Sequence, residues 1–413
     1  MSEPFETMLS VDDAVARVVA IASNLRTSPE RVVLEHSYGR TSADDVSAPF
    51  DVPGYVNSAM DGFAVRADDL DATAETVLRL SGEIFAGGSD IPDVKAGHCV
   101  RITTGAPLPP GADSVVIKEN TRIDGERVFM EPGTTRGANV REAGEDYRAG
   151  DLALRQGDVL TPSRVAVLAS FGQTHAMVAV QPRAVLLTTG DELIAPGEPL
   201  GYGKIHDSNR YGIGGLIEQH GAMLLRHERL RDDPQIVRDA LLRAGEDADF
   251  IVSSGGVSAG EADYLPNVIA NIGKVYFWKV RIKPGMPFLF GQVGKALVFA
   301  LPGNPVSGFA TFLALVKPAL SAMLGKRSAS PQWFGKLTAP ISKRHSRAEF
   351  QRASIACDAT GQLLATPLPK QGSGMLRGVA DADAMVILPE GAHEFAAGDI
   401  VRIIPMPGWS DGV

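Results

Sequence analysis

Residues 182–327 alternate between apolar strand patterns and amphipathic helix patterns, and this alternation constrains the fold more than any other feature. Strand patterns cover AVLLTT (184–189), MLLRHERL (223–230), DFIVSSGG (249–256) and KALVFALPG (295–303). Helix patterns lie between them or follow them, over about 209–220, from Asp233-Pro234 and from Asn304-Pro305. Strands separated by helices of this length form βαβ crossovers. The segment is therefore predicted to be an α/β domain with a mostly parallel sheet in three layers.

The segments before and after this domain have different patterns of apolar residues. A helix is predicted over 11–25 with Ser10 as its cap, short β-like runs fill about 48–145, and helical texture returns at 146–180. From 328 the pattern is β again, which predicts a small C-terminal β-barrel or sandwich. We expect four parts: a discontinuous N-terminal domain of 1–48 and 146–181, a β-rich inserted domain of 49–145, the α/β domain of 182–327, and a C-terminal β domain of 328–413.

Composition limits the class of protein. The 413 residues carry a formal net charge of −9, which argues against a nucleic-acid partner because such binders usually have a basic stripe. The two cysteines are too few to staple this chain, so a reducing, cytoplasmic location is expected. The N-terminus has no pattern of a signal peptide, and Lys317-Pro318 interrupt the most apolar helix, so no membrane span is predicted.

Carboxylates follow three of the four predicted strands. They are Asp191 and Glu192 in TTGDEL, Asp232 and Asp233 in RDDP, and Glu261 and Asp263 in GGVSAGEAD. The carboxyl ends of parallel strands meet at one edge, where ligands bind. Clustered acids repel unless a cation neutralises them, and an oxygen-only donor set favours Mg²⁺ bridging to a phosphate. The alternative is that each acid only caps the next helix, which is the interpretation we favour for Asp233.

Other groups at this edge suit an anion. Gly255-Gly256 and the helix start at Asn304-Pro305 offer backbone N–H groups, and KVRIKPG adds Lys279, Arg281 and Lys283. A Gly-Gly turn after a strand is by itself a weak signal, and the cations could equally be solvated side chains. In the β-rich segment, Asp61 and Thr104 lie in polar turns and Asp146 in a loop. Spacing alone favours a turn role for Asp61.

Taken together, these motifs resemble the molybdopterin molybdenumtransferase family, the MoeA type to which the gephyrin E domain is homologous. The resemblance covers almost the whole chain in the family's order, and GGVSxGxxD with KPGxP and LPGNP is a specific combination. The motifs are SAMDGFAV, RITTGAPLPPGAD, REAGEDYRAGD, TTGDEL, HDSNRY, RDDP, SSGGVSAGEADY, KPGMPFLFG and LPGNPVSG.

The resemblance implies a molybdopterin-binding fold for the α/β domain and a linker role for the discontinuous domain. It also implies an elongated homodimer with its active site between the α/β domain of one subunit and the insertion of the other. The implied reaction takes adenylated molybdopterin and molybdate with Mg²⁺, inserts the metal into the pterin dithiolene and releases AMP. The molybdopterin adenylyltransferase and apo-molybdoenzymes are further candidate partners.

Site residues are carried over motif by motif. The resemblance implies catalytic roles for Asp61, Thr104, Asp146, Glu192 and Asp263, and a metal-binding set of Asp232, Asp263 and Glu192. The expected substrate-binding residues are Gly255, Gly256, Ser258, Lys279, Lys283, Pro302, Asn304, Pro305, Ser307, Arg347 and Ser373. One position departs from the family, because KPGxP often carries Lys or Arg where this chain has Met286.

Two other functions stay open at this point. The first is a molybdopterin adenylyltransferase, although that family is usually a single small domain and lacks the extra β domains. The second is a non-enzymatic molybdopterin-binding scaffold, although the chain has no long disordered linker or second fused domain. Tungstate in place of molybdate also stays open, because both are dianions of the same shape.

Overall fold

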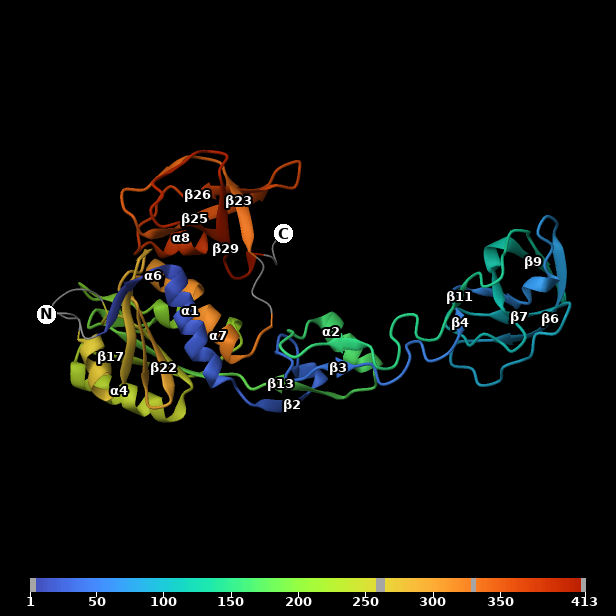
Figure 1. The fold of residues 1–413 in the computed structure, drawn as a ribbon, viewed down its shortest axis with the longest axis horizontal. Helices are drawn as coiled ribbons and strands as arrows, with labels where there is room; N and C mark the ends of the chain where they lie inside the picture. Colours follow the sequence, from blue (N-terminus) through green and yellow to red (C-terminus); the bar gives the residue numbers. More distant parts are fainter. Residues whose placement is uncertain (1–4, 258–263, 328–331, 410–413) are drawn as a thin grey trace. The chain divides into compact units, whose positions relative to one another are not determined.

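The structure of the chain is a computed structural model, and it describes residues 5–257, 264–327 and 332–409. The chain forms two compact units (Figure 1). The main unit comprises Met1–Ala43, Gln156–Thr161 and His175–Val413, and the inserted unit comprises Asp44–Arg155 and Pro162–Thr174.

A seven-stranded sheet is the centre of the main unit. The four strands predicted from the apolar runs are confirmed, and they are adjacent and parallel in the order β22, β18, β14, β17. In sheet order the strands are β1 (Glu6–Leu9), β19 (Lys274–Val280), β21 (Leu289–Val293), β22 (Ala296–Leu301), β18 (Phe250–Ser254), β14 (Arg183–Thr189) and β17 (Met223–Leu230).

Three of these strands extend the sheet beyond the predicted four. β21 is antiparallel to both of its neighbours, β22 and β19, so the sheet is mixed. β1, from the N-terminus, pairs in parallel with β19 at the edge. The N-terminal residues therefore complete the α/β sheet, a location that the composition of 1–48 does not indicate.

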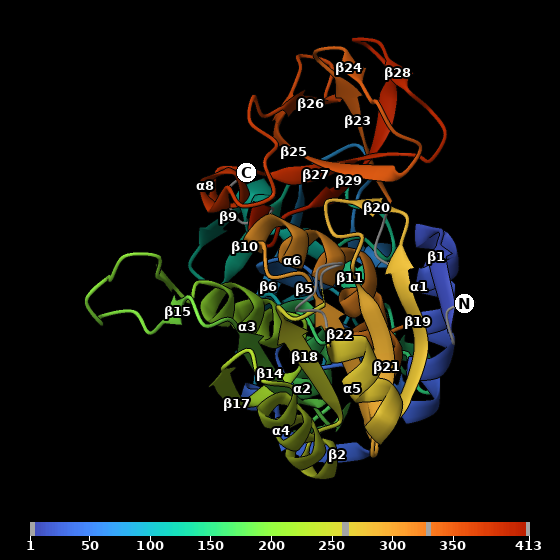
Figure 2. The ribbon, with the colours of Figure 1, turned by 90° about the vertical axis from the view of Figure 1, so that its left-hand side faces the viewer.

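Helices cover both faces of this sheet, as predicted for a three-layer domain (Figures 1 and 2). One face packs against α1 (Val11–Ala22), α3 (Asn209–Gln219), α6 (Pro305–Thr311), a π-helical turn (Phe312–Val316) and α7 (Lys317–Met323). The other face packs against α4 (Pro234–Asp247) and α5 (Leu265–Ile272). Two predicted caps are confirmed, because Ser10 accepts from the Asp13 N–H and Asp233 from the N–H groups of Gln235 and Ile236.

The helical run Pro305–Met323 is apolar enough and long enough to cross a membrane by those criteria alone. Most of this run is buried within the main unit, where its side chains join the core between the sheet and α1. Burial of this kind is typical of a core helix.

The predicted C-terminal β domain is a closed five-stranded barrel. Its strands in ring order are β25 (Ala348–Cys357), β26 (Leu363–Pro367), β23 (Trp333–Leu337), β29 (Ile400–Pro405) and β27 (Ala384–Leu388), which pairs back to β25. The short β20 (Ile282–Lys283) joins it beside β25. Phe350 and Met385 of the barrel belong to the same core cluster as the central sheet, so barrel and sheet pack together.

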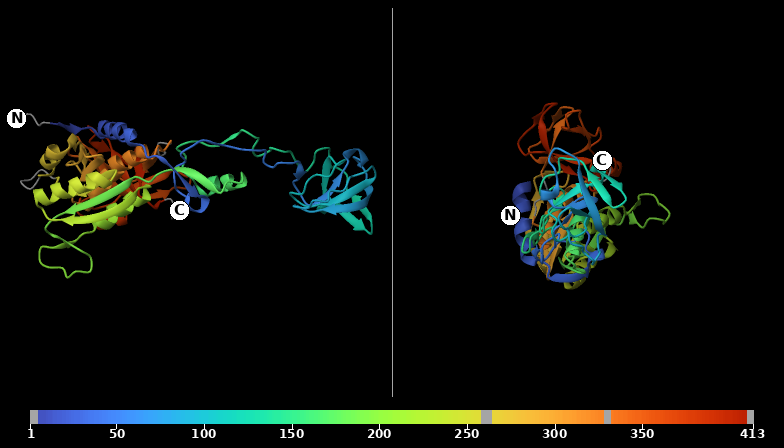
Figure 3. Two further views of the ribbon diagram at one scale, coloured as in Figure 1. Left: turned by 90° about the horizontal axis from the view of Figure 1, so that it is seen from below. Right: turned by 90° about the vertical axis from the view of Figure 1, so that its right-hand side faces the viewer.

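Smaller elements complete the main unit. Figures 2 and 3 show the segment between β15 (Leu193–Ile194) and β16 (Ile205–His206) extending outward from the α/β domain. The remaining elements are β2 (Pro29–Val33), β13 (His175–Ala179), β24 (Ile341–Ser342), β28 (Glu394–Phe395) and α8 (Leu376–Ala380).

The inserted unit is mostly β, as predicted. Its six-stranded sheet has the order β8 (Ser114–Ile117), β5 (Gly62–Val65), β7 (His98–Ile102), β6 (Thr76–Ile84), β10 (Arg127–Met130) and β9 (Thr121–Asp124). Side chains of β5 alternate between two small cores, with Phe63 and Val65 in one and Ala64 in the other. The unit also contains the strand pairs β4 (Asn57–Ser58) with β11 (Val140–Arg141) and β3 (Val46–Ser47) with β12 (Leu152–Leu154), and the helix α2 (Pro162–Ser170).

A buried arginine, Arg352, organises the loop between β26 and α8. Only 1% of Arg352 is exposed, and its guanidinium donates to the carbonyl oxygens of Lys370, Gly372 and Met375. The side chain of Gln371 adds a further bond to the guanidinium. These bonds tie the loop of 370–375 to the barrel wall, since a buried guanidinium needs acceptors on every side.

We predict that Arg352→Met lowers the free energy of unfolding by about 3 kcal/mol, because the loop 370–375 loses the bonds of three carbonyl groups to the buried guanidinium. Urea denaturation measures this change. The matched control is Arg377→Met, whose side chain is 92% exposed and pairs with Asp381, and it should change stability by no more than about 0.5 kcal/mol. Equal effects of the two substitutions would contradict the structural role of Arg352.

Candidate functional site

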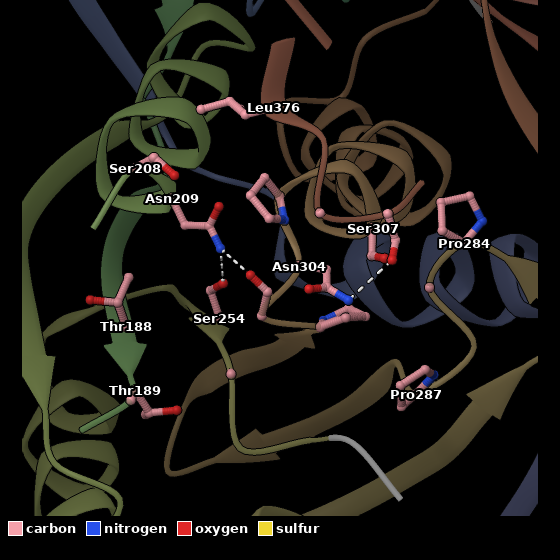
Figure 4. Close-up of a pocket in the computed structure, with 18 of the residues that line it drawn as sticks. Thr188, Thr189, Ser208, Asn209, Ser254, Pro284, Pro287, Asn304, Ser307 and Leu376 are labelled. Carbon is pink, nitrogen blue, oxygen red and sulfur yellow. Dashed lines mark hydrogen bonds between the residues drawn. The ribbon is translucent and has the colours of Figure 1, made fainter. Parts of the chain in front are cut away.

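A pocket of about 900 Å³ opens at the carboxyl edge of the seven-stranded sheet, between the α/β domain and the barrel (Figure 4). The loops that follow β14, β17, β18 and β22 all contribute to its walls, as predicted from the position of their polar residues. The α3 N-terminus, the loop after β20 and the barrel loop 371–376 form the remaining walls. The pocket therefore joins two domains of the main unit.

Strand register brings the loops to the same level. Thr188 of β14 lies opposite Ser254 of β18, which lies opposite Leu301 of β22. After Ser254 the chain turns at Gly255, whose φ of +104° favours glycine. A Cβ at Gly255 would lie 2.5 Å from the Thr189 carbonyl oxygen, so β14 and the turn can approach this closely only without a side chain.

An amide from the HDSNRY motif ties two of these loops together. The Asn209 Nδ2 donates to Ser254 Oγ at 2.8 Å and to the Gly303 carbonyl oxygen at 2.7 Å (Figure 4). Both donor hydrogens of the amide are used, which leaves its oxygen as an acceptor. Asn209 thus fixes the position of the β22 loop relative to the β18 loop.

Beneath this amide lies a buried polar triad. Thr188 Oγ1 donates to Asp207 Oδ2 at 2.6 Å and lies 2.8 Å from His227 Nε2, and only 2% of Asp207 is exposed. Burial by itself raises the pKa of Asp207, but hydrogen bonds from His227, Thr188 and the Arg210 N–H outweigh burial and hold it below its ordinary value. Asp207 is therefore a buried carboxylate at the start of α3.

The barrel is held to the helix start by two bonds. Asn304 Nδ2 donates to Ser373 Oγ at 3.1 Å, and the Val306 N–H donates to the Ser373 carbonyl oxygen at 3.1 Å. Asn304 occupies the predicted cap position of α6 but makes no side-chain bond to the helix N–H groups, because its amide is directed to the barrel. The loop fixed by Arg352 thus reaches the pocket through Ser373.

The acidic wall comes from the α/β domain. Glu192 and Asp232 both line the pocket and are exposed to it. Asp232 accepts the Asp191 N–H at 3.3 Å and the Tyr264 hydroxyl at 3.5 Å. Burial and then the negative charge of Asp232 raise the pKa of Tyr264. Among the described residues no group of three His, Cys, Asp or Glu side chains is placed to hold a metal ion.

The basic wall lies on the barrel side. Lys283 Nζ lies 3.1 Å from Glu349 Oε1, and the Glu349 side chain is 8% exposed. The guanidinium of Arg347 lines the pocket and has no ion-pair partner within 5–257, 264–327 and 332–409. Met286 lines the same region and brings a thioether where the family motif often has a cation. The pocket thus has an acidic wall with Glu192 and Asp232, and a second wall where Arg347 of the barrel lies near the Lys283–Glu349 pair.

Most predicted site residues of the α/β and barrel domains line this one pocket. Those that do are Glu192, Asp232, Gly255, Gly256, Lys283, Pro302, Asn304, Pro305, Ser307, Arg347 and Ser373. Lys279 is not among the lining residues, and its ammonium lies 3.7 Å from the centre of the Trp278 ring. Ser258 and Asp263 lie outside the described residues.

The other predicted residues belong to the inserted unit. The structure brings Asp61 and Thr104 together, because Asp61 Oδ1 accepts the Thr104 N–H at 2.8 Å and its hydroxyl at 2.9 Å. The Thr104 bonds and Lys118, whose Nζ is 3.6 Å from Oδ2, lower the pKa of Asp61. Asp146 is exposed, and its backbone N–H donates to the Val52 carbonyl oxygen.

Asp207 and Asn209 are not among the predicted site residues, although the family resemblance includes their motif. Asp207 and Asn209 belong to HDSNRY, which precedes the 209–220 helix pattern. A cap position directly before a helix that starts at the sheet edge was the signal that could have found them.

Three family models together match most of the chain. They are the MoeA N-terminal region (domain I and II) over 9–172, the probable molybdopterin binding domain over 185–322, and the MoeA C-terminal region (domain IV) over 335–406. The chain therefore belongs to the MoeA family.

Individual relatives agree with this assignment. The molybdopterin molybdenumtransferase of Haemophilus influenzae is 35% identical over 96% of this chain and 98% of its own length. The molybdopterin molybdenumtransferase 2 of Mycobacterium tuberculosis is 33% identical over 91% and 94%. The crystal structure of the molybdopterin biosynthesis moeA protein from Pyrococcus horikoshii matches at a TM-score of 0.83, with 28% identity over 97% and 100% of the two chains.

We predict that Asp207→Asn destabilises the protein at neutral pH and that this effect shrinks in acid. A carboxylate whose pKa is lowered on folding adds stability above its unfolded-state pKa of about 3.8. That contribution is lost as the pH falls from this value through the folded-state pKa. Unfolding free energies of both proteins at several pH values from 7 down to about 3 measure the difference. A difference that stays constant below pH 4 would refute an ionised Asp207.

Proposed function

We propose that this chain inserts molybdenum into molybdopterin, using molybdate and adenylated molybdopterin as substrates and releasing AMP. The observation that carries the proposal is the pocket at the sheet edge of a MoeA-family chain, where acidic and basic walls face one cavity. A substrate with a negatively charged pyrophosphate needs cations and N–H donors, and a second anion needs a separate cationic wall. Two curated relatives that this chain matches over nearly their whole length are named molybdopterin molybdenumtransferase.

The pyrophosphate of the pterin nucleotide would lie at the turn of Gly255 and Gly256. Both glycines have positive φ, so the backbone there can approach a ligand closely. Thr189 Oγ1 is buried, lines the pocket next to this turn, and has no hydrogen-bond partner in the described part of the chain. A buried hydroxyl without a partner is costly, and a ligand oxygen would satisfy it.

Glu192 and Asp232 would hold Mg²⁺ in this site. Two exposed carboxylates are too few for a closed all-protein cage, but Mg²⁺ commonly binds one or two carboxylates together with substrate phosphates and water. Oxygen donors on this wall therefore fit the ion, and Asp263 is a third candidate from the sequence. When bound, Mg²⁺ would neutralise charge on the phosphates and polarise the phosphorus.

Molybdate would be bound by the basic wall. Arg347 offers a guanidinium without an ion-pair partner among the described residues, and Ser307 and Ser373 offer hydroxyl groups in the same pocket. Lys283 forms an ion pair with the buried Glu349 carboxylate, so it would bind an anion less strongly than Arg347. Loss of an oxo group as water needs two protons, which a carboxyl group of the acidic wall would relay from solvent. Tungstate has the same shape and charge, so this wall gives no basis for choosing between them.

Asp61, Thr104 and Asp146 would complete the site from a second subunit of a homodimer. Asp61 and Thr104 form one bonded pair in the inserted unit, with Lys118 beside them. A hydrogen-bonded and ionised Asp61 would orient Thr104 toward a ligand. We propose that each catalytic centre combines the pocket of one subunit with this pair from the other.

We predict that Asp232→Asn lowers Mg²⁺-dependent AMP release and molybdenum insertion by a factor of about 10² or more, because a metal ligand loses its charge. The assay combines adenylated molybdopterin, Mg²⁺ and molybdate, and measures AMP and reconstitution of an apo-molybdoenzyme. The matched control is the adjacent Asp233→Asn, which keeps a helix cap and should retain activity.

Equal activity of Asp232→Asn and the wild type would contradict the metal role of Asp232. ATP consumption by the pure protein would instead favour the adenylyltransferase, and tight pterin binding without turnover would favour a scaffold.

The shared site makes a further prediction about mixed dimers. Asp61→Asn and Asp232→Asn are each expected to be inactive, but a re-associated mixture should regain about a quarter of wild-type activity. Half of the randomly formed dimers would contain one of each chain, and one of the two sites in such a dimer would be intact. Absence of any recovery, when mixed dimers are shown to form, would mean that both residues act in one chain.

A further inference from the structure

A second cavity of about 710 Å³ lies on another side of the main unit, between α1, α7 and the end of β29. It shares no lining residue with the pocket at the sheet edge. Its lining includes five residues that can carry positive charge, which are Arg26, His220, Lys317, Lys326 and Arg402. Of the described residues that line it, none is an aspartate or a glutamate.

The two lysines are half-buried at this cavity. Burial lowers the pKa of Lys317, and burial together with the charge of Lys317 lowers the pKa of Lys326. Lys326 Nζ lies 3.4 Å from the His220 carbonyl oxygen, which is a long hydrogen bond. Two partly desolvated ammonium groups that repel each other without a nearby carboxylate destabilise the fold, unless an anion joins them.

His220 adds a second unsatisfied group. Its ring stacks on Phe312 with 5.8 Å between the ring centres, and its Nε2 is buried without a hydrogen-bond partner among the described residues. Burial and then the charges of Lys317 and Lys326 lower the pKa of His220 to about 4. The imidazole is therefore neutral at pH 7, so it can donate or accept a hydrogen bond without adding repulsion.

The helix itself is adapted at this point. The π-helical turn Phe312–Val316 ends where Lys317 begins α7, next to Pro318. Pro318 has no N–H for the carbonyl four residues before it, which favours a widened turn. π-helical turns often occur at functional sites, because they change which residues a helix presents. Here the turn directly precedes the lysine that lines the cavity.

We propose that this cavity binds a phosphate-bearing small molecule, whose phosphate lies between Lys317 and Lys326. A phosphate dianion would match two ammonium groups and also accept hydrogen bonds from neighbouring donors. Trp333, Pro318, Pro405 and Met406 also line the cavity and form an apolar wall suited to the remainder of such a molecule. The volume is larger than one phosphate needs, which favours a ligand with an organic part.

Site-resolved lysine labelling tests this proposal on the full chain. Wild-type protein is treated with an amine-acylating reagent at constant ionic strength, with and without inorganic phosphate, and labelling rates are read by mass spectrometry. Phosphate at ten times its dissociation constant should slow labelling of Lys317 and Lys326 by about tenfold, because only the free fraction reacts. Lys336, an exposed lysine on β23, should be unaffected.

A variant and a second probe sharpen the result. Lys317→Gln should weaken the protection of Lys326 by phosphate at least about tenfold, since one of two charges is lost. The thermal midpoint of the variant checks that it folds. AMP in place of phosphate distinguishes the sources, because protection at lower concentration assigns the organic part to the apolar wall, and equal protection assigns the site to the phosphate group alone.

One outcome of the labelling experiment would contradict the proposal. If phosphate and AMP at about 10 mM leave both lysines unprotected, or protect Lys336 equally, the cavity is not an anion site. The result does not depend on the proposed transferase activity. Arg347→Gln, in the pocket at the sheet edge, should leave the protection of Lys317 and Lys326 unchanged.

Discussion

Parallel pairing of β14, β18 and β22 is the constraint on which the rest of the site depends. Their backbone hydrogen bonds place Thr188, Ser254 and Leu301 at one level, so three loops leave the sheet together. The glycine turn at 255 packs on β14 because no Cβ intervenes. Asn209 then bonds to two of these loops at once. A shift of this strand register by one residue would move the loops apart, and the pocket would lose its present walls.

The pocket is assembled from two domains, and charged side chains of both domains line it. The α/β loops bring carboxylates, and the barrel side brings the guanidinium of Arg347 and the Lys283 pair with Glu349. The junction between them is held by the ion pairs Arg281–Glu390 and Lys283–Glu349 and by the bonds of Ser373 at the start of α6. Arg352 shapes the barrel loop from within, and Ser373 carries that loop to the start of α6. Rigid support of this kind keeps both walls at a set separation.

Sequence periodicity predicted the four core strands, the helices α3, α4 and α6 and the convergence of the strand loops, because long apolar runs with clear caps are strong signals. It did not predict α5. It did not place β1, a four-residue strand whose paired residues in β19 are 271 positions further along the chain. Nor did it find β21, because FLFGQV is short, contains a glycine and is also compatible with a loop. The burial of Arg352 could not be predicted from the sequence pattern, because arginine is seldom buried and only the carbonyl groups around it explain its position. Asp207 was missed for the same reason, as tertiary partners decide that it is buried and ionised.

The π-helical turn at Phe312–Val316 has a consequence for how this family can vary. Such a turn is equivalent to one extra residue in an otherwise regular helix. Deleting a single residue there would rotate everything that follows by about 100° relative to α6. The start of α6 lies at the sheet-edge pocket, while Lys317 and Ser321 of α7 line the second cavity. One continuous helical segment thus lines a separate cavity near each of its ends. A change of one residue in its length would alter the direction in which α7 presents its side chains relative to those of α6.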